Sequence, residues 1–365
     1  MKITVITVCL NSADTIEKTI QSVAVQECHE LEYIIIDGGS TDGTLDILDK
    51  YDAYIDKRIS EPDKGIFDAM NKGIGMAEGD IIAILNSDDW YEEGALKMVI
   101  TAFEQSDCDC VCCDNYVVGK DGKKIYYYGT DMSADDLYYR MIYFHSAVFC
   151  KRKYFRKCGN FDLSYKMAAD YDWFLWVMEQ KPELYLLHQP VFTFCYGGVS
   201  SVCEKECARE AREIAMKHLP PDKEDYQGKI DERFYEIIIR TADRKEVYSS
   251  LQELLSSQNE NILWGAGVRG VQCVKWFREI GIKVHAVIDS DEKCWGQKIQ
   301  GAVVYSPELL QGKACNLIIT PENNISDIRN EIADKIKGNF CIYELRQLRG
   351  MLADRLEKRY QEVSE

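Results

Sequence analysis

The sequence has no long hydrophobic run. No stretch of its 365 residues approaches the roughly 18 apolar residues that a membrane-spanning helix needs. The apolar segment 3–10, ITVITVCL, is too short for a signal peptide and lacks a cleavage site of small residues. We therefore expect a cytoplasmic protein, with at most peripheral contact with the inner face of a membrane.

The sequence also lacks an excess of positive charge. Its 44 lysines and arginines stand against 61 aspartates and glutamates, and the formal net charge is −17. A phosphate backbone is bound by clustered Lys and Arg, so this balance argues against nucleic acid as a partner. It does not exclude a nucleotide held through a metal ion. Hydrophobic residues make up 46% of the chain, which is enough for a substantial core.

Cysteine is abundant, yet a ligand set for zinc is lacking. The chain has 15 cysteines, and without an export signal we expect reduced thiols used as small apolar side chains. The cluster CDCVCC contains one C-x-x-C spacing, between Cys110 and Cys113, which could indicate zinc. No second ligand pair with suitable spacing follows. Cys108, Cys110 and Cys112 alternate on one face of a predicted strand, and we interpret the cluster as structural thiols.

Alternating strand and helix patterns predict an α/β fold. In the first hundred residues, strands are expected at 2–10, 31–39 and 53–63 and again from Ile81, with helical patterns between them. Such alternation implies a parallel sheet with right-handed crossovers. A second α/β pattern begins near residue 259 and contains further strands.

We predict four parts along the chain. They are a first α/β domain over 1–201, a helical connector over 202–258, a small Rossmann-like α/β domain over 259–343 and a C-terminal amphipathic helix over 344–365. The last helix places Leu345, Leu348, Leu352 and Leu356 on one face. Such a stripe is typical of a core or of a dimer contact, and a membrane-surface helix is the alternative.

Polar side chains gather where the strands of the first domain end. In an open α/β sheet, ligands bind outside the carboxyl ends of the strands. Glycine at Gly39 would let a ligand approach the backbone closely. The side chains near these ends are Thr7, Asn11, Asp37, Asp63, Lys64, Asn86, Asp88 and Asp89. Acidic strand ends beside one lysine suit a nucleotide diphosphate bridged by a divalent cation.

Asp88 and Asp89 follow a strand that is apolar on both faces. Mg²⁺ and Mn²⁺ bind through one or two carboxylates plus substrate phosphates. Adjacent carboxylates repel each other unless they are solvated or neutralised by a cation. The spacing therefore favours a metal site, and an acidic turn capping the next helix is the alternative.

Four motifs together resemble a known family. They are TVITVCLNSADTIEKTIQSV, IIIDGGSTDGT, SEPDKGIFDAMNKGIGMAEGD and LNSDDWY. In order and spacing, about residues 1–200 resemble the inverting family 2 glycosyltransferases of GT-A fold, and most closely the colanic-acid type that builds bacterial exopolysaccharide and capsule.

The resemblance implies roles for the strand-end residues. It implies that the nucleotide base and ribose are lined by Thr7, Asn11, Asp37 and Asp63, that Lys64 contacts the diphosphate, and that Asp88 and Asp89 bind the metal. Two residues differ from the family motifs, and both differences bear on how the donor is bound. Asn86 stands at the first acidic position of the metal motif, and Gly38 stands where a second aspartate is usual.

A catalytic base is also implied. In an inverting transfer, a carboxylate takes the proton of the attacking acceptor hydroxyl. The segment KMAADYDWFLW resembles the base motif of the family, with Ala169 where Glu is common. It implies Asp170 as the base, with Asp172 as a second candidate. A helix N-terminus with acidic first-turn residues is the alternative.

Two further segments belong to the predicted site. His145, in FHSAVFCKRKYFRKCGNFD, could contact the diphosphate or the acceptor, or could be structural. YGGVSS, at 196–201, resembles a loop that closes over the site.

A second glycine motif begins the later α/β pattern. Gly265, Gly267 and Gly270 lie between a strand and a helix, and Asp289 ends the next strand. This is the context of a dinucleotide fingerprint. Three interpretations stay open: a scaffold or docking module, a regulatory nucleotide or nucleotide-sugar site, and a redox site. We do not favour an NAD-type cofactor here, because no partner domain for hydride chemistry is visible.

These features predict an inverting glycosyltransferase that depends on Mn²⁺ or Mg²⁺. We expect it to move a sugar from a nucleotide-diphosphate donor to a glycan or lipid-linked glycan in polysaccharide biosynthesis, and the resemblance implies a UDP-sugar as that donor. A sugar nucleotidyltransferase would carry a Gly-rich loop with Arg where this chain reads CLNSADTIEKT. A non-catalytic nucleotide-sugar-binding or complex-organising protein is the other alternative. The donor sugar, the acceptor and a possible homodimer are left open.

Overall fold

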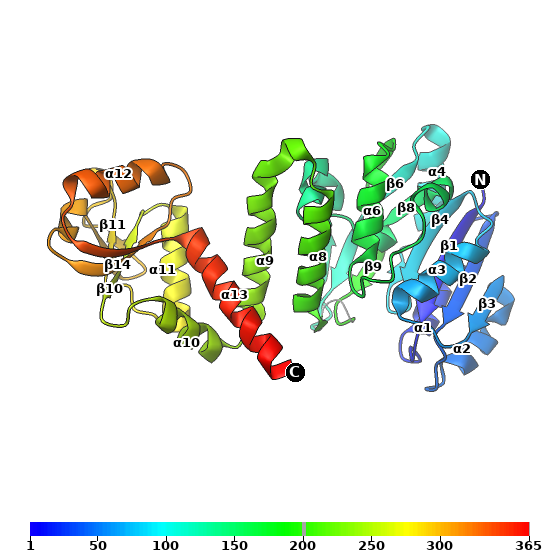
Figure 1. Ribbon diagram of the computed structural model, residues 1–365. Coiled ribbons are helices and arrows are strands. Elements are labelled where there is room, and N and C mark those ends of the chain that lie inside the picture. The colour runs from blue at the N-terminus through cyan, green and yellow to red at the C-terminus, as the bar shows by residue number, and fades with distance from the viewer. Residues whose placement is uncertain (199–201, 365) are drawn as a thin grey trace. The chain divides into compact units, whose positions relative to one another are not determined.

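The computed structural model describes residues 1–198 and 202–364 of the chain. The chain divides into two compact units, Met1–Ile230 and Asp231–Glu365 (Figure 1). Each unit contains one β-sheet with helices packed on it. No helix among the described residues has both the length and the apolar character needed to cross a membrane.

The first unit is built on one mixed sheet with the strand order β3-β2-β1-β4-β8-β6-β9-β5, and β7 pairs with β6. Four parallel strands form one half: β1 (Ile3–Cys9), β2 (Leu31–Asp37), β3 (Lys57–Ser60) and β4 (Ile81–Asn86). The other half contains β5 (Trp90–Tyr91), β6 (Cys110–Val118), β7 (Lys124–Tyr127), β8 (Val148–Lys151) and β9 (Leu184–Cys195). β8 is antiparallel to both β4 and β6, which makes the sheet mixed.

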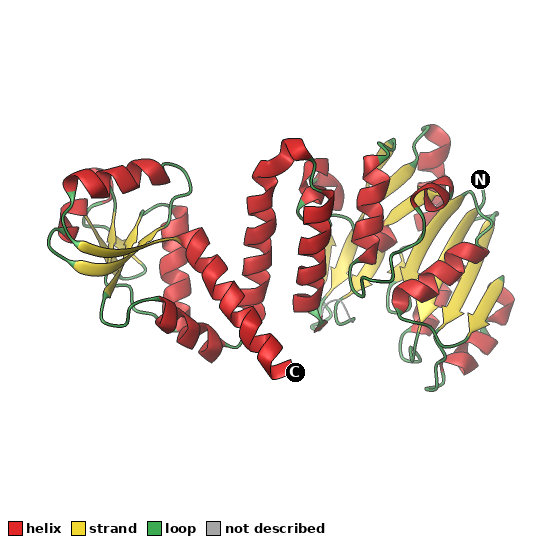
Figure 2. Cartoon of the chain, in the orientation of Figure 1, coloured by secondary structure: helices red, strands yellow, loops and turns green. Residues whose placement is uncertain are grey.

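Helices cover both faces of this sheet (Figure 2). One face carries α1 (Ile16–Ala24), α2 (Thr44–Lys50) and α4 (Ala95–Gln105). The other carries α3 (Ile66–Met76), α5 (Lys153–Cys158), α6 (Ala169–Glu179) and α8 (Glu204–His218). Because side chains alternate along a strand, Val5 packs on the first face and Ile6 on the second.

The cysteine cluster belongs to these two cores. Cys110 and Cys112 pack on one face of β6, and Cys113 packs on the other. Cys108 lies before β6 begins and packs with Cys113, so the expected alternation starts only at Cys110. In the described part of the chain no group of three His, Cys, Asp or Glu side chains is placed to hold a metal ion. These four thiols act as apolar side chains of the sheet.

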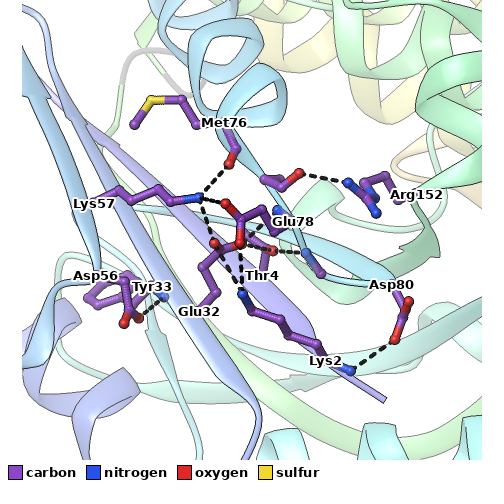
Figure 3. A network of polar contacts seen from close by, with 12 residues as sticks. Lys2, Thr4, Glu32, Tyr33, Asp56, Lys57, Met76, Glu78, Asp80 and Arg152 are labelled. Carbon is purple, nitrogen blue, oxygen red and sulfur yellow. Dashed lines mark hydrogen bonds and ion pairs between the residues drawn. The ribbon is translucent and has the colours of Figure 1, made fainter.

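A charge network centred on the buried Glu32 lies at the amino edge of the first sheet (Figure 3). Glu32, with a side chain 2% exposed, pairs with Lys2 at 3.4 Å and with Lys57 at 2.9 Å. It also accepts hydrogen bonds from Thr4 Oγ1 at 2.6 Å and the Glu78 N–H at 2.8 Å. Burial opposes ionisation, but these partners outweigh it and lower the pKa of Glu32 to about 2. The network ties the starts of the parallel strands together.

The second unit has a sheet with the order β12-β13-β11-β10-β14-β15. The strands are β10 (Glu260–Trp264), β11 (Ala286–Ile288), β12 (Lys298–Ile299), β13 (Ala302–Tyr305), β14 (Ala314–Ile319) and β15 (Asn339–Glu344). All are parallel except β12, and the first strand, β10, is central. This is the order of a doubly wound Rossmann-like sheet, as predicted.

Besides most of α9 (Gln227–Thr241), the second unit contains the helices α10 (Arg244–Leu254), α11 (Val268–Ile280), α12 (Ile325–Lys335) and α13 (Leu345–Ser364). In α13, Leu348, Leu352 and Leu356 are buried, and the helix packs on α10 and β15. The predicted leucine stripe is therefore core of this unit, and these side chains are not available to a membrane surface.

The structure divides the region of the predicted connector between the two units. The first unit extends through Ile230, so it includes α8 and the start of α9 (Gln227–Thr241). α8 belongs there because Ile214 and Ala215 are fully buried in the core beside α6. Helical periodicity predicts such helices but does not tell which core their apolar faces enter.

Candidate active site

The carboxyl ends of the parallel strands meet at one edge of the first sheet. The register aligns Cys9 with Asp37, Asp37 with Ser60, and Val8 with Asn86. Residues that follow these positions are therefore neighbours in space although they are far apart in sequence. The residues at these strand ends lie along one edge of the sheet, opposite the network of Glu32.

Asp37 organises the loop that follows β2. Its carboxylate accepts hydrogen bonds from the Ser40 hydroxyl, from Ser60 Oγ at 2.6 Å, and from the N–H groups of Gly39 at 3.1 Å and Ser40 at 3.0 Å. Burial disfavours the ionised form, but these donors outweigh it and lower the pKa of Asp37. Asp37 is fully buried. It shapes the 38–41 loop and does not offer a free carboxylate to a ligand.

Asn11 joins the loop after β1 to the same turn. Its Oδ1 accepts from the Thr41 N–H at 2.9 Å, and its N–H donates to Ser40 Oγ at 2.7 Å. Thr7, predicted to line the nucleotide, is fully buried instead and accepts a hydrogen bond from Tyr33 OH at 3.2 Å. Thr7 is placed in the core because it lies two residues before the strand ends.

Asp63 lies directly over Gly38. Its Oδ1 accepts from the Gly65 N–H at 2.9 Å, and a Cβ at Gly38 would overlap its Oδ2. The Asp63 carboxylate fills the space that a side chain at position 38 would need. This explains why Gly38 stands where a second aspartate is usual in the family. Lys64 is exposed at the same turn. Gly39 has φ +90°, which a side chain would strain.

Asp88 and Asp89 have different environments. Asp89 is fully buried; its Oδ1 accepts from the Cys195 N–H at 2.9 Å, and its buried Oδ2 has no hydrogen-bond partner among the described residues. Asp88 is partly exposed. Thr19 Oγ1 holds the turn by donating to Ser87 O at 3.0 Å and to Asp89 O at 2.7 Å. Burial raises the pKa of Asp88, and burial together with repulsion from Asp88 raises that of Asp89 well above its usual range.

This pair fits a cation whose coordination is completed by a ligand. An orphaned buried carboxylate oxygen beside a second desolvated carboxylate is a site that positive charge would stabilise. The residues that the structure describes include no third His, Cys, Asp or Glu at this place. A cation here would therefore need other oxygens, such as phosphates. Asp88 is the partly exposed carboxylate that could meet them, whereas Asp89 is buried beside it in the chain.

His145 connects the acidic strand end to the expected base. Its Nδ1 lies 3.2 Å from Asp170 Oδ2 and its Nε2 lies 3.3 Å from Asn86 Oδ1. Asp170 sits in the first turn of α6 with its side chain 21% exposed. The structure thus brings together three residues that the sequence places in separate motifs.

Asp172 is not part of this group. It is buried and accepts hydrogen bonds from Lys217 Nζ at 2.8 Å and His218 Nε2 at 2.9 Å, both on α8. Burial opposes its ionisation, but these two partners outweigh burial and lower the pKa of Asp172. The prediction of Asp172 as a second candidate base is therefore wrong, because its carboxylate makes a structural contact between α6 and α8.

Glu210 on α8 is a residue that the motifs did not indicate. Its carboxylate accepts hydrogen bonds from the backbone N–H groups of Lys166 at 2.8 Å, Met167 at 2.7 Å and Ala168 at 3.0 Å. These residues directly precede the turn that carries Asp170. No local signal could have found Glu210, because its partners lie more than 40 positions earlier in the chain.

The predicted closing loop is described only in part. Tyr196, Gly197 and Gly198 are described, whereas 199–201 lie outside the described residues. A Cβ at Gly198 would come within 2.9 Å of Asp88 Oδ2, so the backbone of this loop passes beside the acidic motif. A glycine at this position permits that close approach.

The glycine motif of the second unit has two positions that the fold requires. Gly265 has φ +113°, and a Cβ at Gly270 would overlap Gly265 O. Gly267 has extended backbone and no atom within 4 Å of its Cβ position. Asp289, the acidic residue of the predicted fingerprint, accepts from the Ala266 N–H at 2.7 Å and so closes the glycine turn itself.

Comparison with known sequences agrees with this geometry. Residues 4–166 match the profile of Glycosyl transferase family 2. The chain is 30% identical over 206 residues to the PGL/p-HBAD biosynthesis glycosyltransferase of Mycobacterium bovis, covering 54% of this chain and 78% of that protein. It is 33% identical over 174 residues to chondroitin synthase of Pasteurella multocida, covering 46% of this chain and 18% of that one.

Solved structures share the fold. S. aureus TarS superposes with a TM-score of 0.53 at 19% identity, covering 70% of this chain and 47% of that chain. TarS 1–349 in complex with UDP gives a TM-score of 0.51 at 17% identity, covering 70% of this chain and 79% of that chain. These likenesses show a GT-A-like α/β fold. With the sequence match over most of the mycobacterial relative, they lead to one conclusion: the chain belongs to glycosyltransferase family 2 and is a transferase.

Proposed function

We propose that this chain transfers a sugar, with inversion, from a nucleotide-diphosphate sugar to a hydroxyl of a glycan or lipid-linked glycan. The observation that supports this most directly is the placement of Asp170 beside the acidic strand end, through His145 and Asn86. An inverting transfer needs a base for the acceptor hydroxyl, and an acidic, cation-compatible turn beside that base suits a cation-bound diphosphate. The binding of UDP by the TarS fragment favours a UDP-sugar as donor.

In the proposed reaction, Asp170 accepts the proton of the acceptor hydroxyl as that oxygen attacks the anomeric carbon. Of the two candidate bases in the first turn of α6, Asp170 is the accessible carboxylate, because Asp172 is held by α8. Asp88, supported by Asp89, would hold a divalent cation whose charge offsets the negative charge on the departing diphosphate. The 38–41 loop and Lys64 would contact the nucleotide and its phosphates.

The proposed acceptor class is supported by the resemblance to exopolysaccharide enzymes and by the names of two relatives, a PGL/p-HBAD biosynthesis glycosyltransferase and a chondroitin synthase. Both names point to glycan building. A lipid-linked acceptor would bring the protein to a membrane surface. We therefore include bacterial polysaccharide biosynthesis in the proposal.

The test is UDP release from a panel of UDP-sugars, with and without Mn²⁺. We expect release with at least one donor, stimulation by Mn²⁺, and loss of at least about 100-fold in Asp170→Asn, the range of general-base catalysis. Tight UDP binding without turnover, unchanged by Asp170→Asn, would instead support a non-catalytic nucleotide-sugar-binding protein.

A further inference from the structure

His145 is held at both ring nitrogens. Nδ1 lies 3.2 Å from Asp170 Oδ2, and Nε2 lies 3.3 Å from Asn86 Oδ1. The ring is 22% exposed, so solvent reaches it from one side. Its two partners belong to different elements, since Asn86 ends β4 and Asp170 lies in the first turn of α6.

These two contacts define where the proton of the ring must be. A carboxylate only accepts hydrogen bonds, so the contact with Asp170 requires a proton on Nδ1. An amide can donate or accept, depending on its orientation. As placed, Asn86 presents its acceptor Oδ1 to Nε2, so a neutral ring with its proton on Nδ1 needs the amide turned to donate its N–H to Nε2. An aspartate at this position would instead place the ring between two carboxylates.

The surroundings of Asp170 are mostly apolar. A narrow cavity of about 30 Å³ lies beside it, and its polar lining residues are His145 and Asp170 themselves. The other lining side chains are apolar, among them Ile82, Phe155 and Trp173. The adjacent Tyr171 N–H donates to this carboxylate at 2.9 Å, but it does so at Oδ1, whereas His145 contacts Oδ2.

From this geometry we propose that His145 is a positioning residue for the base. It holds Oδ2 of Asp170, so that the carboxylate keeps one orientation toward the acceptor hydroxyl, and Asn86 in turn fixes the ring. This inference rests on the proposed function, because orientation of Asp170 affects turnover only if Asp170 takes the proton. A misplacement of about 1 Å at a reacting group can lower a rate by about 100-fold.

Three substitutions of His145 separate positioning from packing. His145→Leu fills the space but has no donor, and we expect kcat to fall about 10- to 100-fold with the KM for the donor nearly unchanged. His145→Asn places an amide N–H close to the position of Nδ1, so kcat should largely recover. His145→Gln places its amide near the position of Nε2, toward Asn86, and should not recover. Thermal melting of all three variants controls for folding.

Wild-type kcat in His145→Leu, or equal recovery by Gln and Asn, would overturn the inference while leaving the proposed function intact. A second readout does not depend on turnover: ¹⁵N NMR of histidine-labelled protein, with His145 assigned from the His145→Asn spectrum. We expect the proton on Nδ1 of His145 in the wild type and a changed Nδ1 signal in Asp170→Ala. A ring protonated on Nε2 alone would refute the contact, even if no donor is ever turned over.

Discussion

The carboxylate of Asp63 occupies the space that a side chain at Gly38 would need. The turn after β2 and the turn after β3 therefore constrain each other, and both belong to the edge where we propose that the nucleotide binds. A small side chain at 38 must displace Asp63, which would lose its hydrogen bond from the Gly65 N–H.

Gly38→Ala should therefore weaken donor binding more than it weakens the fold. Because Asp63 is a side chain that can turn away, we expect a loss of stability at or below about 1 kcal/mol. The KM for the donor should rise several-fold. The double variant Gly38→Ala/Asp63→Ala tests the cause: if the clash is responsible, the effects of the two substitutions are not additive.

Glu210 should contribute to activity through the loop before Asp170. In Glu210→Ala, the N–H groups of Lys166, Met167 and Ala168 lose their acceptor, and we expect about 1–3 kcal/mol lower stability and a lower kcat. Glu213→Gln, an exposed residue of the same helix, is the matched control. Denaturant unfolding and UDP release measure both effects, and equal behaviour of the two variants would contradict the assignment.

Substitutions of Asp172 and Asp170 should have different effects, the first on the stability of the fold and the second on transferase activity. Asp172→Asn breaks a buried contact with His218 and Lys217, so we expect about 3 kcal/mol lower stability. Asp170→Asn should leave the melting temperature nearly unchanged and remove transfer. A stable but inactive Asp172→Asn would reverse the roles assigned to the two aspartates.

The Glu32 network should make the first unit sensitive to acid. The pKa of Glu32 is lowered from 4.5 to about 2 in the folded state. The ionised Glu32 carboxylate thus contributes about 3 kcal/mol to the free energy of unfolding at pH values above its unfolded pKa. This contribution is lost as the pH falls toward 2. Glu32→Gln should lower stability at neutral pH and flatten the acid limb of the unfolding curve. Glu93→Gln, an exposed control, should leave that limb as it is.

Two glycines of the second unit form a matched pair. Gly270→Ala would bring a Cβ against Gly265 O, a backbone atom that cannot move away, so we expect about 1–3 kcal/mol lower stability of this unit. Gly267→Ala meets no atom within 4 Å and should not destabilise it. Native-state hydrogen exchange of β10 and α11 measures this locally, and equal effects would contradict the packing argument.

The sequence alone determined the fold class and the family. Uninterrupted apolar strands such as 81–85, alternating with helical patterns, require a parallel α/β sheet, and strand-end motifs indicate where such a sheet binds ligands. The glycine motif likewise predicted a second Rossmann-like sheet. These features are readable because each depends on residues that are close together in the chain.

Only the tertiary structure decided which carboxylates are free to act. Asp37 and Asp172 look alike in sequence to Asp63 and Asp170, but their carboxylates are held by the loop of Ser40 and by α8. Asp89 differs from its neighbour Asp88 because it is fully buried and accepts at Oδ1 from the Cys195 N–H. Cys195 lies 106 positions from Asp89, and His218 lies 46 positions from Asp172. Hydrogen-bond partners at such separations are set by how the strands and helices pack, so local patterns cannot reveal them.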